Sequence, residues 1–176
     1  MERKKPRKPK KFRFQVFADW IVAHYAPCRV ADIGGGKGLL TYLLNQRGFE
    51  GVVIDPVEQG LPSKYTDIHT KRRVRIPGDA TVPYREEIFE PEMAKDFDLL
   101  IGMHVHGSCI KMLEAAEMFQ KNFVLVPCCV IDEPIVKVPD VRWTDSLFEL
   151  ARSKGLPVKE DRLGFVGRAR VLYVSH

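Results

Sequence analysis

The feature that most constrains the fold is a short apolar run that ends in an acidic residue and three alternating glycines, Val30 to Gly38 (Val-Ala-Asp-Ile-Gly-Gly-Gly-Lys-Gly). Glycine tolerates positive φ and leaves no side chain between the backbone and a ligand. A helix predicted to begin at Leu39 would place its positive end at the same point. A strand that passes through such a loop into a helix is typical of α/β domains that bind a nucleoside ligand.

A second acidic residue strengthens this interpretation. Asp55 follows the apolar run at residues 52–54, and an acid about 20 positions after a glycine loop is the usual holder of a ribose hydroxyl pair. The nicotinamide fingerprint is Gly-x-Gly-x-x-Gly, which would need a glycine where Leu39 stands. The strict alternation of Gly34, Gly36 and Gly38 therefore argues against a nicotinamide cofactor.

Together with Gly78-Asp79-Ala80, these residues resemble the successive cofactor motifs of the class I methyltransferases, which use S-adenosylmethionine. The resemblance implies a set of cofactor-binding residues, which are Asp32, Gly34, Gly36, Gly38, Asp55, Asp79, Ala80 and Met103. In that family the first acid and the glycines line the methionine end, the second acid binds the ribose, and the third lies by the adenine. An alternative for Asp79 is a simple turn after a short strand.

Alternating apolar patterns predict one α/β domain. The predicted helices are residues 14–24, 39–47, 109–120 and a last helix that Thr144 caps and that ends at Lys154. The predicted strands are residues 29–33, 51–54, 74–76, 98–103, 123–126, 158–163 and 169–174. We expect a single Rossmann-like, doubly wound, seven-stranded, mostly parallel sheet with a closing antiparallel hairpin, which resembles the complete class I methyltransferase sheet. The predicted division is a basic flexible tail at residues 1–13 and a methyltransferase domain at residues 14–176.

The composition is that of a soluble domain. No apolar run approaches the roughly 20 residues that cross a membrane, and the N-terminus lacks the apolar core of a signal peptide. The four cysteines form no disulfide framework and no Cys-x-x-Cys pair, which suits a reducing compartment. We therefore expect a cytoplasmic protein with no membrane partner.

Positive charge is concentrated at the N-terminus. The net charge of +5 divides into +7 on residues 1–13 and −2 on the remainder. Such a basic segment is typical of a sequence that binds phosphates, so the predicted partner is RNA, bound from Arg3 to Arg13. A second basic cluster, from Lys71 to Arg75, extends this predicted surface. The alternative is a solubilising tail and an ordinary solvated face.

Candidate acceptor-side residues follow two strands that are predicted to be neighbours. His104 and His106 follow the strand at residues 98–103, and Cys128 and Cys129 follow the strand at residues 123–126. Because ligands meet open α/β sheets at the carboxyl ends of the strands, these side chains are expected near one pocket. The Asp/Asn-Pro-Pro-Tyr motif of amino-group methyltransferases is missing.

The same two segments resemble the His-x-Cys-Gly and Pro-Cys-Cys segments of acceptor-stem tRNA 2′-O-methyltransferases and their methyltransferase-like relatives. His104, Gly107, Pro127, Cys128 and Cys129 match, while His106 stands in place of the family's first cysteine and the zinc-finger segments are absent. The resemblance implies RNA, with tRNA favoured, as the substrate. It also implies that His104 or His106 accepts the proton of a ribose hydroxyl, a task that suits a group with a reference pKa of about 6.5.

Three alternatives remain open for the cysteines. They pack as inert thiols, or one thiolate attacks a pyrimidine ring, or His104, His106, Cys109 and one of Cys128 and Cys129 bind zinc. The spacing matches no standard zinc site, so no metal is assigned.

Two other functions also remain open. One is a small-molecule methyltransferase whose basic tail only aids solubility, and the other is a non-catalytic nucleoside-binding or RNA-binding module of the same fold.

Overall fold

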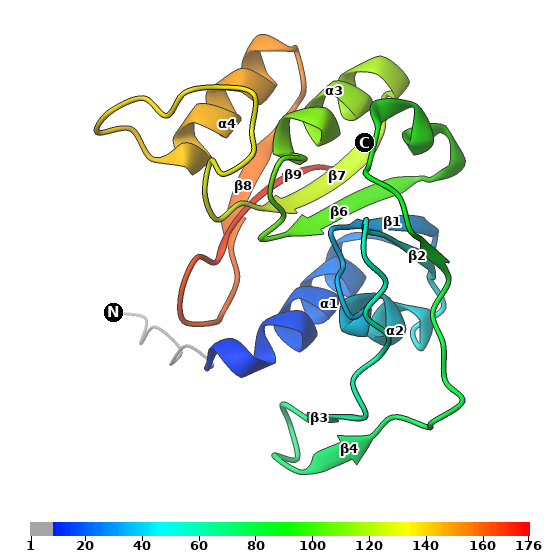
Figure 1. Ribbon diagram of the computed structural model, residues 1–176. Coiled ribbons are helices and arrows are strands. Elements are labelled where there is room, and N and C mark those ends of the chain that lie inside the picture. Colours follow the sequence, from blue (N-terminus) through cyan, green and yellow to red (C-terminus); the bar gives the residue numbers. More distant parts are fainter. Residues whose placement is uncertain (1–8) are drawn as a thin grey trace.

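The computed structural model describes residues 9–176, which form a seven-stranded mixed β-sheet with helices on both faces and a separate two-stranded hairpin (Figure 1). The strands are β1 (Arg29–Ile33), β2 (Glu50–Ile54), β3 (Lys64–Thr66), β4 (Arg73–Arg75), β5 (Tyr84–Arg85), β6 (Leu99–Met103), β7 (Asn122–Val126), β8 (Lys159–Arg162) and β9 (Arg170–Val174). The helices are α1 (Arg13–His24), α2 (Leu39–Asn45), α3 (Cys109–Phe119) and α4 (Trp143–Ser153), with 3₁₀ turns η1 (Lys10–Phe12) and η2 (Pro91–Asp96).

The seven-stranded sheet has the order β5-β2-β1-β6-β7-β9-β8. Strands β5, β2, β1, β6 and β7 run parallel, whereas β9 is antiparallel to both β7 and β8. This confirms the predicted mostly parallel sheet with its closing hairpin. The chain leaves β1 in one direction toward β2 and later returns to its other side as β6. Ligands of open α/β sheets bind at such a switch in strand order, beside the carboxyl ends of the strands.

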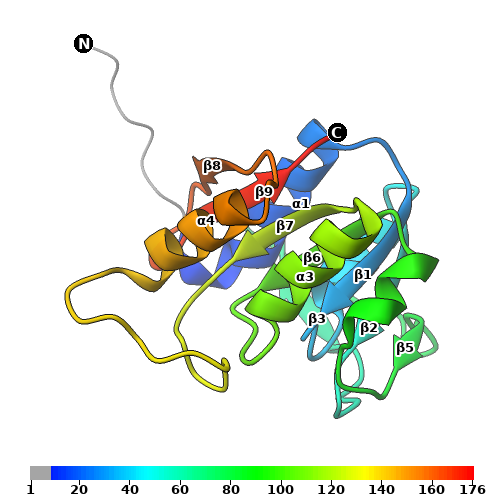
Figure 2. The same cartoon turned by 90° about the horizontal axis from the view of Figure 1, so that it is seen from above.

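Each face of the sheet is covered by its own pair of helices (Figures 1 and 2). Helices α1 and α2 cover one face, where Phe17 and Ile21 pack one helical turn apart in the core with Leu44. Helices α3 and α4 cover the other, where Leu113 and Leu147 are fully buried. The central strands are buried from both sides, which explains their unbroken apolar sequences.

The prediction that residues 74–76 form a strand of the main sheet is wrong. Strand β4 pairs antiparallel with β3 in a separate two-stranded hairpin, and its three residues are all exposed. Two arginines flank Val74, and a strand of a sheet covered by helices cannot hold charged side chains on its buried faces. The edge position next to β2 is taken by β5 instead, with Tyr84 opposite Val53.

Two predicted helix ends are also wrong. Thr144 does not cap α4, because the helix begins at the buried Trp143 and Thr144 lies inside the first turn. Helix α2 ends at Asn45 and not at Arg47, since the chain turns there and the Asn45 side chain bonds both backbone polar groups of Gly51. No helix within residues 9–176 has the length and apolar character needed to cross a membrane.

The start of the described chain is held against the β3–β4 hairpin. Of the predicted tail at residues 1–13, residues 1–8 lie outside the described residues. Phe12 in η1 is buried, and the side-chain amide of Gln15 donates to Thr66 O (2.7 Å) and accepts from Ile68 N (2.7 Å). Lys71 lies over the Phe12 ring, 4.6 Å from its centroid. The described end of the first basic segment, residues 9–13, therefore lies beside Lys71 of the second.

Candidate cofactor and acceptor site

The glycine loop after β1 is closely packed underneath and open above. Gly34, Gly36 and Gly38 have φ values of 64°, 56° and 76°, in the left-handed region that favours glycine. A Cβ on Gly34 would lie 2.7 Å from Val105 Cγ2, whereas one on Gly36 would meet nothing closer than Gln59 Nε2 at 3.6 Å. A ligand can therefore approach the backbone at Gly36.

Asp55 lies beside this opening at the end of β2. Its carboxylate accepts hydrogen bonds from Gly36 N (3.1 Å) and Val57 N (3.0 Å). A carboxylate offers about four acceptor positions, so the two oxygens keep capacity for a pair of hydroxyl donors. The half-buried carboxylate and the open backbone at Gly36 fit a ribose, as a nucleoside cofactor would require.

Asp32 lies in the layer below the loop. It is only 2% exposed, accepts a hydrogen bond from the Thr41 hydroxyl (2.8 Å), and would lie 2.6 Å from a Cβ on Gly35. Burial raises the pKa of Asp32 to about 7, an effect that the Thr41 hydrogen bond opposes. In this structure Asp32 supports the loop from beneath.

The third predicted motif lies beside the loop without following a strand of the main sheet. Asp79 is exposed in a turn after β4 that Ala80 N closes onto Pro77 O (3.0 Å). Two residues after Ala80, the Val82 side chain lies 2.7 Å from where a Cβ on Gly38 would stand. Met103 ends β6 and is 9% exposed. Cofactor contacts by Asp79, Ala80 and Met103 stay predictions.

His104 is held in a defined orientation at the end of β6. Its φ of 56° is unusual for a residue with a side chain, and its ring lies edge-on to Phe165. The ring Nε2 lies 2.8 Å from Arg168 O, and because a carbonyl can only accept, Nε2 carries the proton and Nδ1 keeps a lone pair. Burial and the nearby cations Arg13 and Lys10 lower the pKa of His104. The imidazole is therefore neutral at pH 7 and able to accept a proton.

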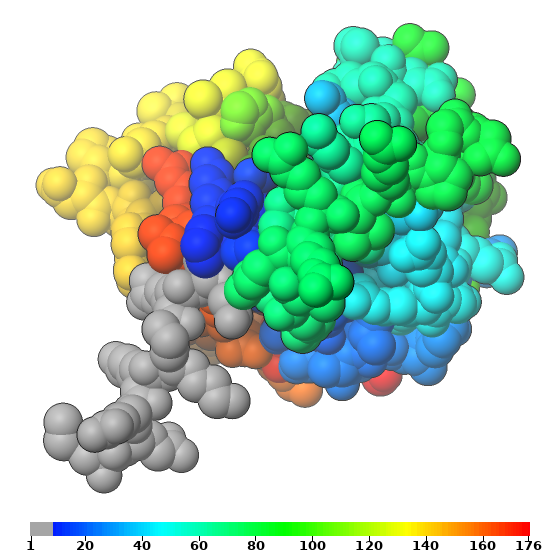
Figure 3. All heavy atoms as spheres, turned by 90° about the horizontal axis from the view of Figure 1, so that it is seen from below, coloured from blue at the N-terminus to red at the C-terminus, as the bar shows by residue number. Residues whose placement is uncertain are grey.

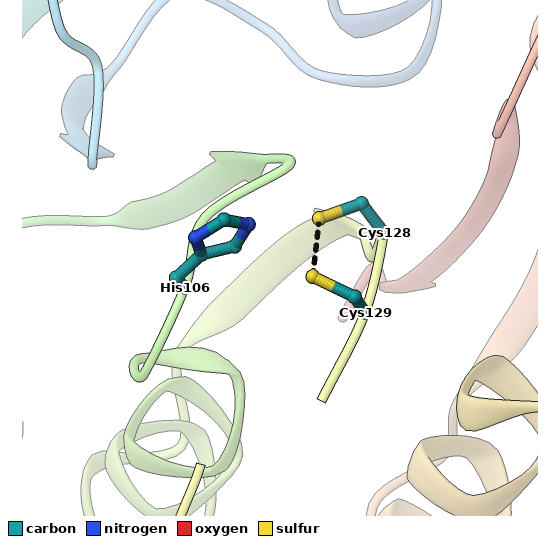
Figure 4. Close-up of side chains that lie close together, drawn as sticks. All are labelled: His106, Cys128 and Cys129. Atoms are coloured by element: carbon teal, nitrogen blue, oxygen red, sulfur yellow. Dashed lines mark hydrogen bonds between the residues drawn. The ribbon is translucent and has the colours of Figure 1, made fainter. Parts of the chain in front are cut away.

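His106, Cys128 and Cys129 form a separate cluster (Figure 4). Their donor atoms all lie within 4.8 Å of one another, and the two sulfurs are 3.2 Å apart. Burial and the Cys129 hydrogen bond raise the pKa of Cys128 to about 11, so this thiol is protonated at neutral pH. Two sulfurs and an imidazole are ligand types that suit zinc. As a protonated thiol, Cys128 is a poor nucleophile.

The zinc grouping considered from the sequence is not assembled in this arrangement. Cys109, the first residue of α3, is fully buried in the core, and its sulfur lies 3.7 Å from Val105 O. His104 Nε2 is already bonded to Arg168 O. Cys128 and Cys129, of which the predicted zinc grouping used only one, are instead the two thiols that lie together.

Three residues that sequence reasoning missed help to build the site. The Tyr84 hydroxyl donates to Val57 O (2.7 Å) and lies 3.3 Å from Gly36 O, Thr41 holds Asp32, and the Arg168 carbonyl fixes His104. Thr41 had a signal, as a polar residue on the apolar face of the helix after the loop. Tyr84 and Arg168 had none, because their roles depend on chain segments far apart in sequence.

The sequence matches no protein-family model. It is 33% identical over 163 residues to a probable tRNA (uracil-O(2)-)-methyltransferase of Caenorhabditis elegans, a match that covers 85% of this chain and 28% of the relative. A Drosophila melanogaster protein of the same name is 31% identical over 114 residues, covering 62% of this chain and 20% of that protein. The chain thus spans about a quarter of the length of the relatives it matches.

Solved structures share the fold at low sequence identity. The ribosomal protein L11 methylase of Lactobacillus delbrueckii has a TM-score of 0.54 at 13% identity, over 93% of this chain and 77% of that one. The antibiotic-resistance methyltransferase Kmr has a TM-score of 0.53 at 14% identity, over 92% of each chain. The chain has the class I methyltransferase fold.

Proposed function

We propose that this chain, with its class I methyltransferase fold, transfers a methyl group from S-adenosylmethionine to an oxygen of RNA, with tRNA as the favoured substrate and a ribose 2′-hydroxyl as the acceptor. The relatives named tRNA (uracil-O(2)-)-methyltransferases support the substrate class. The positive charge at the N-terminal end of the chain supports a polyanionic partner.

The cofactor lies along the glycine loop in this proposal. The glycines at positions 34, 36 and 38 let the cofactor approach the loop backbone closely. Asp55 accepts hydrogen bonds from the ribose hydroxyls, and Asp32 supports the loop from below. Asp79, Ala80 and Met103 complete the cofactor-binding set. When bound, S-adenosylmethionine supplies a methyl carbon that an acceptor oxygen can attack.

His104 is the proposed general base. Its Nε2–H is committed to Arg168 O, so Nδ1 takes the proton of the acceptor hydroxyl as the oxygen forms its new bond. Cys128 and Cys129 line the neighbouring cavity, where the substrate nucleotide would enter, and His106 lies against these two thiols.

One observation carries the proposal: the nucleoside cradle and an oriented, neutral imidazole adjoin at one edge of the sheet. Val105, the neighbour of His104, packs directly against Gly34 of the loop. The His104 backbone is tied to the adjacent strand β7 through Val126 O (2.9 Å). This supports the proposal that an electrophile held at the loop and a base at the end of β6 would lie at the same edge of the sheet.

The test is transfer of labelled methyl from S-adenosylmethionine into size-fractionated RNA. His104→Gln is the informative variant, because glutamine keeps an N–H donor for Arg168 O and removes the proton acceptor; Gln120 already adopts the left-handed region in this chain. Loss of a general base costs roughly 10²–10⁴-fold in rate. His106→Gln is the matched control, because His106 lies in the same β6–α3 connection as His104. This variant should retain most of the activity.

The outcomes separate the alternatives. Label in the tRNA fraction that is lost only with His104→Gln supports hydroxyl methylation. Loss only with Cys128→Ala would replace this mechanism by a covalent or metal-dependent one. Cofactor binding without label in any RNA would point to a small-molecule acceptor, and no cofactor binding at all would leave a non-catalytic module.

A further inference from the structure

A cavity of about 700 Å³ opens beside the Cys128–Cys129 pair. Its walls come from three stretches that are distant in sequence, namely residues 127–131 after β7, residues 137–144 leading into α4, and residues 162–170 in the hairpin of β8 and β9. Figure 2 shows the connection between β7 and α4 extending away from the sheet on this side. Its volume lies within the roughly 300–1,000 Å³ that ligand pockets usually have.

The lining of this cavity is strongly basic. It includes five basic residues and one acidic residue, which are Lys137, Arg142, Arg162, Arg168 and Arg170, and Asp140. Two of the arginines are neutralised by neighbours: Asp145 pairs with Arg142 and Arg170, and Glu160 also pairs with Arg170.

Three cations of the lining remain available to a ligand. Lys137, Arg162 and Arg168 are exposed, and within residues 9–176 none of them has a carboxylate partner within 4.0 Å. Surface cations usually lie among acids of the opposite sign. Three uncompensated cations around one cavity instead favour a ligand with several negative charges.

Arg168 joins the cavity to the proposed site. Its side chain lines the cavity while its carbonyl accepts the hydrogen bond from His104 Nε2. The Arg168 charge also lowers the pKa of His104 and opposes the rise in the pKa of Cys128, which lines the same cavity. An anion on Arg168 is therefore held next to the proposed base.

The positive charge continues past the cavity toward the N-terminal segment. The charges of Lys10 and Arg13 also lower the pKa of His104, and Lys71 of the β3–β4 connection lies over Phe12. In the space-filling view the blue start of the described chain lies against the orange-red hairpin segment that helps to form the cavity (Figure 3). Cations that are spread from the cavity to the N-terminal segment match several phosphates better than a single phosphate.

We propose that this cavity holds the sugar–phosphate backbone of the RNA substrate, with its phosphates on Arg168, Arg162 and Lys137, and so presents the acceptor ribose to His104. The inference rests on the proposed activity toward RNA and names the surface that would bind the substrate. Phosphate contacts fix the register of a nucleic acid without reading its sequence, so these residues set the position of the ribose and not the identity of its base.

The test measures binding of full-length protein to fluorescein-labelled single-stranded RNA by anisotropy between 50 and 200 mM salt. The variants are Arg162→Ala, Arg168→Ala and the double substitution, and alanine at position 168 keeps the carbonyl that holds His104. Each lost phosphate contact should weaken binding and lower the slope of log K against log salt by about 0.7. In methyl transfer, KM for RNA should rise while kcat changes less.

Arg152→Ala is the matched control. Arg152 lies on the exposed side of α4, with 63% of its side chain accessible and only a 3.7 Å contact to Glu149. The Arg152→Ala substitution removes one positive charge and leaves the cavity lining unchanged. A control that loses as much affinity and slope as Arg162→Ala would overturn the cavity assignment, because the effect would then be one of net charge.

Failure of this inference is distinguishable from failure of the proposed function. Methyl transfer to RNA with unchanged RNA binding in the Arg162 and Arg168 variants would overturn only the cavity assignment. Weakened RNA binding in these variants, in a protein that transfers no methyl group, would support the cavity and overturn the activity. Two results together would overturn the assignment to a chain of phosphates. Uridine monophosphate would displace the RNA, and the affinity of the protein for RNA would not depend on the length of the RNA.

Discussion

At the scale of single residues, the fixed tautomer of His104 is the feature with the clearest consequence. Its pKa lies below the ordinary histidine value because of burial and nearby cations, so the proton-accepting form still dominates at pH 6.5. The acid limb of the kcat/KM profile for RNA should therefore fall below pH 6.5. The His106→Gln variant should show the acid limb at the same pH as the parent protein. An acid limb centred at or above pH 6.5 in the parent protein would contradict the assignment of His104 as the base.

Asp32 gives a prediction about stability. Its folded pKa of about 7 exceeds the unfolded value of about 3.9, so between these values the folded protein holds a proton that the unfolded chain releases. The contribution of Asp32 to the free energy of unfolding consequently decreases as pH rises from 4 to 7. Asp32→Asn keeps an acceptor for Thr41 and should remove this decrease, as urea unfolding at pH 5 and pH 8 would measure.

The exposed Asp79 supplies the control for Asp32. Asp79→Asn removes a carboxylate from a solvated turn and should leave the pH dependence of unfolding as in the parent. Equal pH dependence in Asp32→Asn and the parent would mean that Asp32 is ionised in the folded state.

At the scale of elements, the N-terminus of α4 could be stabilised by a side-chain cap from Thr144 or by the ion pairs of Asp145. Thr144 lies inside the first turn and makes no capping hydrogen bond, while Asp145 in the same turn pairs with Arg142 and Arg170. Thr144→Ala should therefore change the unfolding free energy by less than about 0.5 kcal/mol. Asp145→Asn should cost up to about 1 kcal/mol, or roughly 2–4 °C in Tm, by breaking a pair that is partly exposed.

Calorimetry of the two variants checks this order. A larger loss for Thr144→Ala would restore the sequence-based capping prediction for Thr144.

Strands β1 and β6 show how far local pattern goes, and β5 shows where it stops. The apolar runs of β1 and β6 predicted their elements almost to the residue, because a strand buried on both faces must be apolar throughout. Strand β5 has two residues, Tyr84 and Arg85, too few for any periodicity to appear. The sequence-based prediction therefore missed β5 and counted the exposed residues 74–76 among the seven strands of the main sheet.

At the scale of the whole molecule, the N-terminal segment and the β3–β4 hairpin form one predicted RNA-binding side. Removal of residues 1–8 takes away five of the basic residues and keeps the buried Phe12. The deletion should weaken RNA binding and lower the slope of log K against log salt by about 0.7 for each lost phosphate contact. The Tm should stay unchanged. Anisotropy and thermal unfolding measure the two effects.

The matched control for this deletion replaces the Lys and Arg residues within residues 1–8 by Ser. It should behave as the deletion does. RNA binding that the deletion leaves unaltered would reduce this segment to a solubilising role.

Local sequence patterns were enough to predict the α/β class, the glycine loop with Asp55, and a His segment beside a Cys segment at the sheet edge. These predictions depend on local periodicity, on the conformational freedom of glycine and on the rule that parallel strands end on the same side. The folded structure was needed to show which histidine is oriented, which thiols lie together, and that the charges of Arg162, Arg168 and Lys137 surround one cavity. Those outcomes depend on contacts between segments that are far apart in the chain, and no local pattern records which distant side chain will neutralise a charge or hold a ring.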